Sequence, residues 1–291
     1  MKVFVTGASG YIGTAVIKEL LNAGHQVIGL ARSQASAEII SNVGAEVLLG
    51  NLEDLAVLKK GAALADGIIH TAFIHDFSQY QKAGEVDHSA ITTMAEVLEG
   101  TNKPLIVTSG MLALPPIDGF IREESSAENA PRTSEATALA LAKKGINVSV
   151  IRLPPSVHDK GDKGFIPFII HLARQHGVSA YPENGKNNWS AVHRLDAAKA
   201  FKLALEKANI GAVYNVVGDQ AIETKTIATL IGKELNLPVQ SVSGAAIGAH
   251  FDWMARFISF EGAAVGIKTQ EQLGWQPTQI GLLEDMQANY F

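Results

Sequence analysis

Residues 2–13 read KVFVTGASGYIG, a short β-branched run followed by glycines at positions 7, 10 and 13. The run Lys2–Thr6 predicts a buried strand, and the amphipathic stretch over 13–23 predicts a helix that ends at Gly24. A glycine-rich turn between a strand and a helix is typical of a phosphate-binding loop.

The three glycines have separate expected roles. Gly7 permits a tight turn, Gly10 lets the backbone approach a pyrophosphate, and Gly13 lets the helix pack closely on the strand. The first turn of the helix offers unpaired N–H groups and a partial positive charge to the phosphates. We therefore predict a dinucleotide site on the turn residues Gly7, Ser9, Gly10, Tyr11, Ile12 and Gly13.

The rest of the first half alternates between strand-like and helix-like segments. The predicted strands are 26–31, 46–49, 67–71, 104–108 and 147–152, and the predicted helices are 35–43, 55–64, 80–98 and 133–144. Strands separated by helices imply right-handed crossovers and a parallel sheet. The fold class is α/β, a Rossmann-type doubly wound parallel sheet.

The second half is less regular. It predicts helices at 165–176 and 196–208, a strand at 212–217, and a small α-rich C-terminal substrate lobe over 220–291. We expect the nucleotide-binding core to comprise 1–153 and 191–217. The substrate-binding lobe would comprise 154–190 and 218–291.

The end of the second predicted strand distinguishes two cofactors. An acid there would bond the adenosine 2′-hydroxyl of NAD, but the chain has Ala31-Arg32-Ser33. Arg32, with Ser33 beside it, can offer donors to a 2′-phosphate, which favours NADP. The alternative is that Arg32 is an ordinary solvated arginine.

Composition excludes several classes of function. The 291 residues carry a formal net charge of −5, which gives no basic surface for nucleic acid. The absence of cysteine excludes disulfides and thiolate chemistry. No apolar run is long enough to span a membrane, and Met1 leads directly into a strand, so we expect a cytoplasmic protein without a signal peptide.

Several further motifs accompany the glycine-rich turn. They are Gly50-Asn51-Leu52, Ile69-His70-Thr71-Ala72, Val107-Thr108-Ser109, Arg152-Leu153-Pro154, Val192-His193-x-x-Asp196, Tyr214-Asn215-Val216 and Leu273-Gly274-Trp275. With these motifs the chain resembles the short-chain dehydrogenase/reductase superfamily over nearly its whole length. It is most similar to the extended branch, which includes nucleotide-sugar epimerases and dehydratases.

The resemblance implies roles for residues outside the turn. Asn51 and Leu52 would flank the adenine, although the family usually has Asp at position 51. The ribose and pyrophosphate would be lined by Thr71, Ala72 and Phe73. The loop from Pro154 to Val157 would lie beside the nicotinamide.

The chain departs from the superfamily at its catalytic motif. None of its tyrosines lies between the fifth and sixth predicted strands, so Tyr-x-x-x-Lys is absent. If Arg132 takes the lysine position, Glu128 takes that of the tyrosine. Arg132 could bind ribose or phosphate and stabilise negative charge, or it could be a helix-start arginine in a surface salt bridge. Aligned on the fifth strand, the serine position falls on Gly110, directly after Ser109.

A histidine is then the natural proton donor, because its pKa lies near neutrality. We predict His158, which follows the nicotinamide-side loop, ahead of His75 and then His193. Ser109 and Arg132 would steady the oxyanion, although Ser109 could instead cap the strand end. No grouping has metal-ligand spacing, so no metal site is expected.

The substrate side favours an apolar compound. Nucleotide-sugar enzymes often place an arginine four residues before the histidine of the Val-His motif, and this chain has Trp189 there. Trp189 could line a pocket or pack within the lobe, as could Phe251, Trp253, Met254, Phe257 and Phe260. We predict an NADP-dependent oxidoreductase for a small apolar carbonyl or alcohol. The alternatives are an epimerase or dehydratase with bound cofactor, and a non-catalytic NADP-binding regulator.

The predicted partner is a small-molecule substrate, together with a second copy of the chain. In the superfamily, the helices before strands five and six often pair between subunits. The available apolar positions are Met94, Val97, Leu98, Leu139 and Leu141. We expect a homodimer or a monomer in weak equilibrium with it, unless these side chains only pack on their own sheet.

Overall fold

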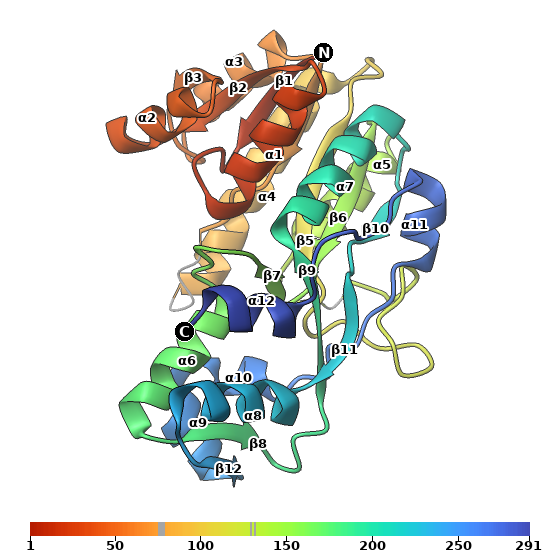
Figure 1. The fold of residues 1–291 in the computed structure, drawn as a ribbon. Coiled ribbons are helices and arrows are strands. Elements are labelled where there is room, and N and C mark those ends of the chain that lie inside the picture. Colours follow the sequence, from red (N-terminus) through yellow and green to blue (C-terminus); the bar gives the residue numbers. More distant parts are fainter. Residues whose placement is uncertain (75–78, 129, 131) are drawn as a thin grey trace.

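The computed structural model describes residues 1–74, 79–128, 130 and 132–291. Its main element is a seven-stranded parallel sheet in the order β10-β6-β5-β4-β1-β2-β3 (Figure 1). The strands are β1 (Lys2–Thr6), β2 (Gln26–Ala31), β3 (Glu46–Leu49), β4 (Gly67–His70), β5 (Leu105–Gly110), β6 (Val148–Leu153) and β10 (Val213–Asn215).

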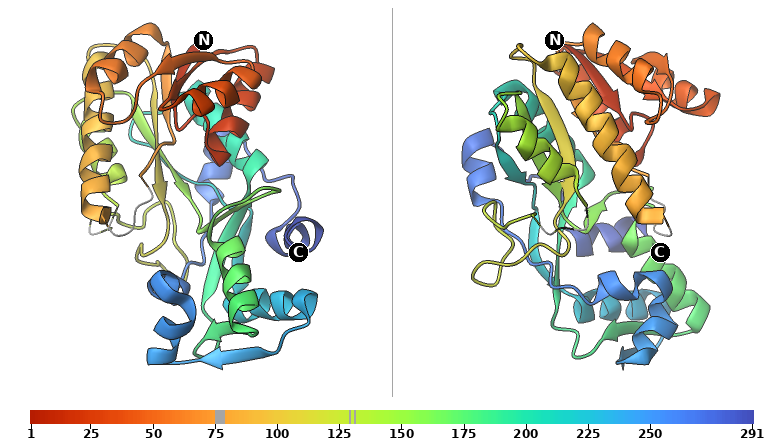
Figure 2. Two further views of the ribbon diagram at one scale, coloured as in Figure 1. Left: turned by 90° about the vertical axis from the view of Figure 1, so that its left-hand side faces the viewer. Right: turned by 180° about the vertical axis from the view of Figure 1, so that it is seen from behind.

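Helices cover both faces of this sheet (Figure 2). One face carries α1 (Tyr11–Asn22), α2 (Gln34–Asn42) and α7 (Arg194–Lys207), and the other carries α3 (Leu55–Leu64), α4 (Tyr80–Leu98) and α5 (Ser134–Ala142). Successive side chains of a strand point to opposite faces, so Val3 and Val5 enter the first core while Phe4 enters the second. Burial on both faces explains the continuous apolar runs.

The strand order places the glycine-rich turn at a point where the connections reverse direction. β1 pairs with β2 on one side and with β4 on the other. Thr6 of β1 is in register with His70 of β4, and His70 is in register with Val107 of β5. Ser109 follows two residues after Val107 on the same strand. Because the carboxyl ends of parallel strands share one edge, these residues and the turn meet where doubly wound folds bind ligands.

A second lobe lies below that edge in Figure 1 and has its own apolar core. Its helices are α6 (Phe165–His176), α8 (Thr224–Leu235), α9 (Ala245–Phe251), α10 (Ala255–Ile258) and α12 (Leu282–Asn289). A two-stranded sheet pairs β8 (Ser179–Pro182) with β12 (Val239–Val242). The three-stranded sheet β11-β9-β7 contains β7 (Ser156–His158), β9 (Asn188–His193) and β11 (Asp219–Glu223).

The predicted Rossmann-type α/β class is confirmed, and the strands at 2–6, 26–31 and 46–49 have their predicted bounds. The C-terminal lobe is mainly helical, as predicted, but the prediction missed five strands, β7, β8, β9, β11 and β12. These strands have three to six residues each, and their pairing partners are distant in the chain. So short a segment carries little periodicity of its own.

The apolar positions predicted for subunit pairing pack mainly inside the chain. Met94 and Leu98 are buried in the core beneath α4, with Leu141 of α5 beside them. Val97 and Leu139 are partly buried against the same core. The homodimer therefore stays a prediction. Within the described residues, no helix is both long and apolar enough to cross a membrane.

Candidate functional site at the carboxyl edge of the sheet

The turn after β1 is held tightly against the end of β4. Gly7 has a φ of +67°, and a Cβ at Gly7 would lie 2.6 Å from Thr71 Oγ1 and 2.7 Å from Ala72 N. A Cβ at Gly13 would come within 2.1 Å of Gly7 O. Only glycine fits these two positions, so the tight turn and the close packing predicted for them are both present.

The first turn of α1 presents open backbone N–H groups. Gly10 is the N-cap, no side chain caps the helix, and the first turn contains no acidic residue. Gly10 N donates to Gly7 O at 2.9 Å, which folds the loop back beneath the helix start. The leading N–H groups of a helix have no intrahelical partner and attract anions. The geometry therefore fits the pyrophosphate of a dinucleotide.

The side chain of Tyr11 turns from this loop toward the other lobe. Its hydroxyl donates to Asp159 O at 2.8 Å, and the guanidinium of Arg194 lies 4.5 Å from its ring centroid. Burial and the nearby Asp162 raise the pKa of Tyr11. The Tyr11 side chain thus makes an interlobe contact.

The end of β2 carries no carboxylate. Ala31 is fully buried, Arg32 is exposed, and Ser33 caps α2 by accepting a hydrogen bond from Ser36 N at 3.2 Å. The first turn of α2 contains no acidic residue. Arg32 and the start of α2 therefore present a locally positive surface beside the adenosine side of the predicted site.

Asn51 and Thr71 have structural contacts at the same edge. Asn51 Oδ1 accepts hydrogen bonds from Glu53 N at 2.8 Å and Asp54 N at 3.1 Å, which shapes the turn before α3. Thr71 Oγ1 donates to Thr6 O at 2.8 Å. Leu52 is partly buried against the core. These contacts order the loops that would flank the adenine and ribose.

Arg132 lies just before α5 and reaches this edge. Its guanidinium stacks 4.2 Å from the ring centroid of Phe73, and Nε donates to Ser134 Oγ at 2.8 Å. Nη2 is enclosed and has no hydrogen-bond partner within the described residues. Arg132 is therefore not a surface salt-bridge residue. An enclosed N–H group without a partner is costly, which points to a ligand atom at this position.

A buried hydrogen-bond chain supports Arg132. Ser134 Oγ donates to Asp87 Oδ2 at 2.5 Å, Asp87 Oδ1 lies 2.9 Å from His70 Nε2, and His70 Nδ1 lies 2.7 Å from Thr6 Oγ1. Burial acts to raise the pKa of Asp87, but the hydrogen bond and charge of His70, with Arg132 and Ser134, leave this pKa lowered. An ionised Asp87 therefore balances the charge of Arg132.

The remaining predicted residues on this side are Ser109, Pro154 and Val157. Ser109 lies on β5 opposite Arg152, is almost fully buried, and makes no side-chain hydrogen bond within the described part of the chain. Pro154 is buried and Val157 partly buried. Ser109 lies at the same sheet edge as Thr6 and His70, and its oxyanion role stays a prediction.

His158 lies in a different environment from the one predicted. Its side chain is fully buried, Nδ1 lies 2.9 Å from Asp285 Oδ2, and Nε2 lies 3.8 Å from Asp219 Oδ2. A general acid must come within hydrogen-bond reach of the group it protonates. Nδ1 is thus paired with a carboxylate inside the protein, whereas Nε2 is enclosed and has no hydrogen-bond partner among the described residues. Because the whole side chain is buried, this geometry does not favour direct donation to a substrate.

The alternative donors gain little support. His75 lies outside the described residues. His193 Nδ1 accepts a hydrogen bond from Leu195 N at 3.2 Å, which leaves the proton on Nε2, 3.7 Å from Asp159 Oδ1. His193, Asp159 and Asp285 could offer ligand atoms within 4.8 Å of one another. However, a protonated Nε2 cannot ligate a metal, and Asp159 Oδ2 already accepts from Arg194.

Trp189 packs within the lobe core and does not line an open pocket. It is fully buried, and its ring lies 5.6 Å from that of Phe165. Phe165 also contacts Trp253 and Phe257, at ring separations of 6.0 and 5.5 Å. Trp253 is 39% exposed, so one edge of this aromatic cluster reaches the surface.

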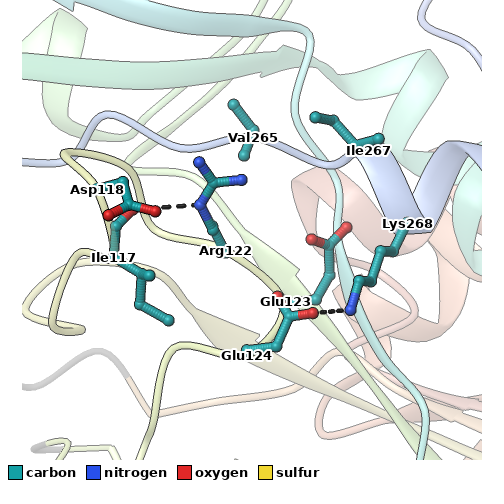
Figure 3. Close-up of a pocket in the computed structure, with 8 residues that line it drawn as sticks. All are labelled: Ile117, Asp118, Arg122, Glu123, Glu124, Val265, Ile267 and Lys268. Atoms are coloured by element: carbon teal, nitrogen blue, oxygen red, sulfur yellow. Dashed lines mark hydrogen bonds and ion pairs between the residues drawn. The ribbon is translucent and has the colours of Figure 1, made fainter.

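A separate pocket of about 360 Å³ lies between the 117–124 loop and α11 (Ile267–Leu273) (Figure 3). Its walls carry charged side chains, including an ion pair between Lys268 and Glu124. Arg122 Nε donates to Ile117 O at 3.2 Å. None of its lining residues is a predicted cofactor or catalytic residue, so this pocket is not the candidate site.

Sequence reasoning missed the residues that surround Arg132. Tyr80 and Asp87 lie on α4, and the ring of Tyr80 is 5.8 Å from that of Phe73. A buried aspartate in an otherwise amphipathic helix was the available signal, because an acid on the apolar face needs a partner. Its partners, at 70 and 134, cannot be inferred from local spacing.

The fold and the glycine-rich edge together define a nucleotide-binding α/β protein of the doubly wound type. The profile of the NAD dependent epimerase/dehydratase family matches residues 3–217. The chain belongs to this family.

Two close relatives match the whole chain. An uncharacterized protein of Saccharomyces cerevisiae is 46% identical, covering 100% of this chain and 99% of its own. One of Schizosaccharomyces pombe is 45% identical, with complete coverage of both. A 4-hydroxy-2-methyl-3-oxo-4-farnesyl-3,4-dihydroquinoline-1-oxide ketoreductase of Stigmatella aurantiaca is 25% identical, over 88% of this chain and 81% of its own.

Among solved structures, the fold is similar to that of DesIV, a dTDP-glucose 4,6-dehydratase from Streptomyces venezuelae with NAD bound. The TM-score is 0.79 at 18% identity, covering 100% of this chain and 96% of DesIV. UDP-glucose 4-epimerase of Thermotoga maritima gives a TM-score of 0.78 at 18% identity, covering 100% and 97%. At this identity, the likeness describes the fold alone.

Proposed function

We propose that the protein is an NADP-dependent oxidoreductase that acts on a small apolar carbonyl compound or the corresponding alcohol. The observation that carries this proposal is the enclosed guanidinium of Arg132, whose Nη2 has no protein partner in the described residues and which lies against Phe73. Hydride transfer to a carbonyl creates negative charge on oxygen. A fixed cation at the cofactor edge stabilises that charge.

The proposed cofactor is NADP. Its pyrophosphate would lie on the open first turn of α1, and its 2′-phosphate near Arg32 and Ser33, where no carboxylate would repel it. When bound, the cofactor supplies or accepts the hydride. The family description and the NAD in DesIV support a nicotinamide dinucleotide of some kind.

The proposed substrate side is apolar. Trp189 stands where a phosphate-binding arginine is common in nucleotide-sugar enzymes, and its ring is buried in the lobe core. The partly exposed edge of the aromatic cluster at Trp253 offers apolar surface instead. The ketoreductase of Stigmatella aurantiaca, by its name, reduces a ketone.

Two measurements test this proposal. Calorimetric titration with NADPH and NADH should give the tighter binding for NADPH. A panel of small ketones, aldehydes and enones should then include compounds that oxidise NADPH continuously. Turnover of a sugar nucleotide without net NADPH oxidation would replace the proposal with an epimerase or dehydratase. Tight NADPH binding with neither activity would favour a regulator.

A further inference from the structure

The first residue of α4, Tyr80, lies in the same side-chain cluster as Arg132. The Tyr80 ring is 5.8 Å from that of Phe73, and the guanidinium of Arg132 is 4.2 Å from the Phe73 centroid. Tyr80 and Asp87 are seven residues apart on one helix, so their side chains share a face. Asp87 is joined to Arg132 through Ser134, and this shared face therefore points toward Arg132.

We infer that Tyr80 is the proton donor of the reaction. Arg132 and Tyr80 would together replace the Tyr-x-x-x-Lys motif, with the phenol supplied by α4 and the cation supplied just before α5. This inference deepens the proposed function and rests on it. The tyrosine and the cation would thus come from α4 and from the segment just before α5, and α4 and α5 pack against each other on one face of the sheet.

The reaction balances without a further reagent. When bound, NADPH would supply the hydride to the carbonyl carbon, and the C–O π electrons would move to oxygen to give an alkoxide. The alkoxide takes the phenolic proton of Tyr80, and the resulting phenolate lies beside the guanidinium of Arg132. A proton from water then restores the phenol. The products are the alcohol and NADP⁺.

The charges around Tyr80 suit a donor. Burial raises the pKa of Tyr80, Arg132 and Arg256 lower it, and Asp87 raises it. The net effect is an increase, so Tyr80 is protonated at neutral pH, as carbonyl reduction requires. Alcohol oxidation requires the phenolate, and we therefore expect reduction to be favoured at pH 7 and oxidation to accelerate at alkaline pH.

The other four tyrosines have different surroundings. Tyr11 donates to Asp159 O, Tyr290 lies 2.9 Å from Asp162 Oδ2, and Tyr214 accepts from Asn209 Nδ2 at 3.1 Å. Tyr181 lies in the second lobe beneath Lys225. Tyr11 lies at the same sheet edge, but its hydroxyl points to Asp159 of the other lobe. Tyr181 lies on β8, Tyr214 on β10 and Tyr290 after α12, so Tyr80 is the tyrosine that shares a cluster with Arg132 and Phe73.

The experiment compares Tyr80→Phe with Tyr181→Phe, a matched removal of one hydroxyl from the second lobe. With any carbonyl that the wild type reduces, Tyr80→Phe should lower kcat about a hundredfold to ten-thousandfold with NADPH affinity retained. Tyr181→Phe should retain wild-type kcat. Near-normal turnover by Tyr80→Phe would overturn the inference while leaving the proposed function intact.

A second readout needs neither cofactor nor turnover. The ultraviolet difference in phenolate absorbance between wild type and Tyr80→Phe reports the titration of Tyr80. Arg132→Met should move this titration to higher pH, and Arg132→Lys, which keeps the charge, should move it less. If Arg132→Met leaves it unchanged, the pairing of Tyr80 with Arg132 is wrong. Suppose that Arg132→Met shifts the titration of Tyr80 but the wild type reduces none of the carbonyls tested. The pairing of Tyr80 with Arg132 would then be supported, and only the oxidoreductase proposal would be rejected.

Discussion

His158 Nδ1 lies 2.9 Å from Asp285 Oδ2, and neither side chain reaches solvent. The contact joins β7 to α12 across 127 positions of the chain. Asp285 Oδ1 also accepts from Asn289 Nδ2 at 2.6 Å. This buried pair anchors the last helix against the three-stranded sheet, which is a structural role for the histidine predicted to be a proton donor.

His158→Gln should therefore reduce stability. Removing a buried hydrogen-bond partner from Asp285 should lower the free energy of unfolding by about 1–3 kcal/mol, measured by urea denaturation. Glu96→Gln, which removes one partner of an exposed ion pair with Lys59, should change it by less than about 0.5 kcal/mol. A stable His158→Gln protein with a hundredfold lower kcat would restore His158 as the donor.

Arg32→Ala should weaken NADPH binding by about tenfold to a hundredfold, because a charge-assisted contact to the 2′-phosphate is lost. NADH binding should be nearly unchanged, since NADH lacks this phosphate. Titration calorimetry with both cofactors measures the difference. The control is Arg174→Ala, which removes an exposed arginine from α6 in the other lobe. Equal losses for the two cofactors would show that Arg32 does not contact the 2′-phosphate.

Gly13→Ala should disrupt the turn that precedes α1. The new Cβ would lie 2.1 Å from Gly7 O, and neither backbone segment can move freely. We expect a loss of about 1–3 kcal/mol in stability together with weaker NADPH binding. Gly248→Ala is the control, since a Cβ there meets nothing within 4 Å and α9 should gain up to about 1 kcal/mol. Unchanged stability and cofactor affinity in Gly13→Ala would contradict the close packing.

Asp87→Asn should destabilise the protein in a pH-dependent manner. The folded-state pKa of Asp87 is lowered, so its contribution is fully present above its ordinary pKa of 3.8 and is lost as pH falls through the folded-state value. The stability difference from wild type, about 1–3 kcal/mol at pH 7, should narrow in acid below pH 3.8. Thermal melting between neutral and acidic pH tests this. A difference that is constant with pH would mean that Asp87 is not held ionised.

The nucleotide-binding half could be predicted because its signals are local. The turn over 7–13 follows β1 directly, and the strand, the glycines and the helix are contiguous in the sequence. Gly13 is required by its close approach to Gly7 O, whereas Gly7 is also required by Thr71 and Ala72, which lie far away in the chain. The alternation of strands and helices over 26–98 is likewise a property of short windows, in which burial of both sheet faces imposes continuous apolar runs. The doubly wound class could be predicted because right-handed crossovers leave few topologies, but the strand order itself came from the structure.

The environment of the catalytic candidates depended on contacts that no local window contains. Tyr80 and Asp87 come from α4, and Arg132 comes from the segment just before α5. The packing of these two helices on one face of the sheet places the three side chains together. His158 follows a loop that the sequence associates with the nicotinamide, yet α12 covers it with a carboxylate from position 285. The sequence alone determined the glycine-rich turn between β1 and α1, because the strand, the glycines and the helix follow one another in the chain. The tertiary structure decided which side chains reach the reacting edge, because burial and proton-transfer distances depend on how distant segments pack.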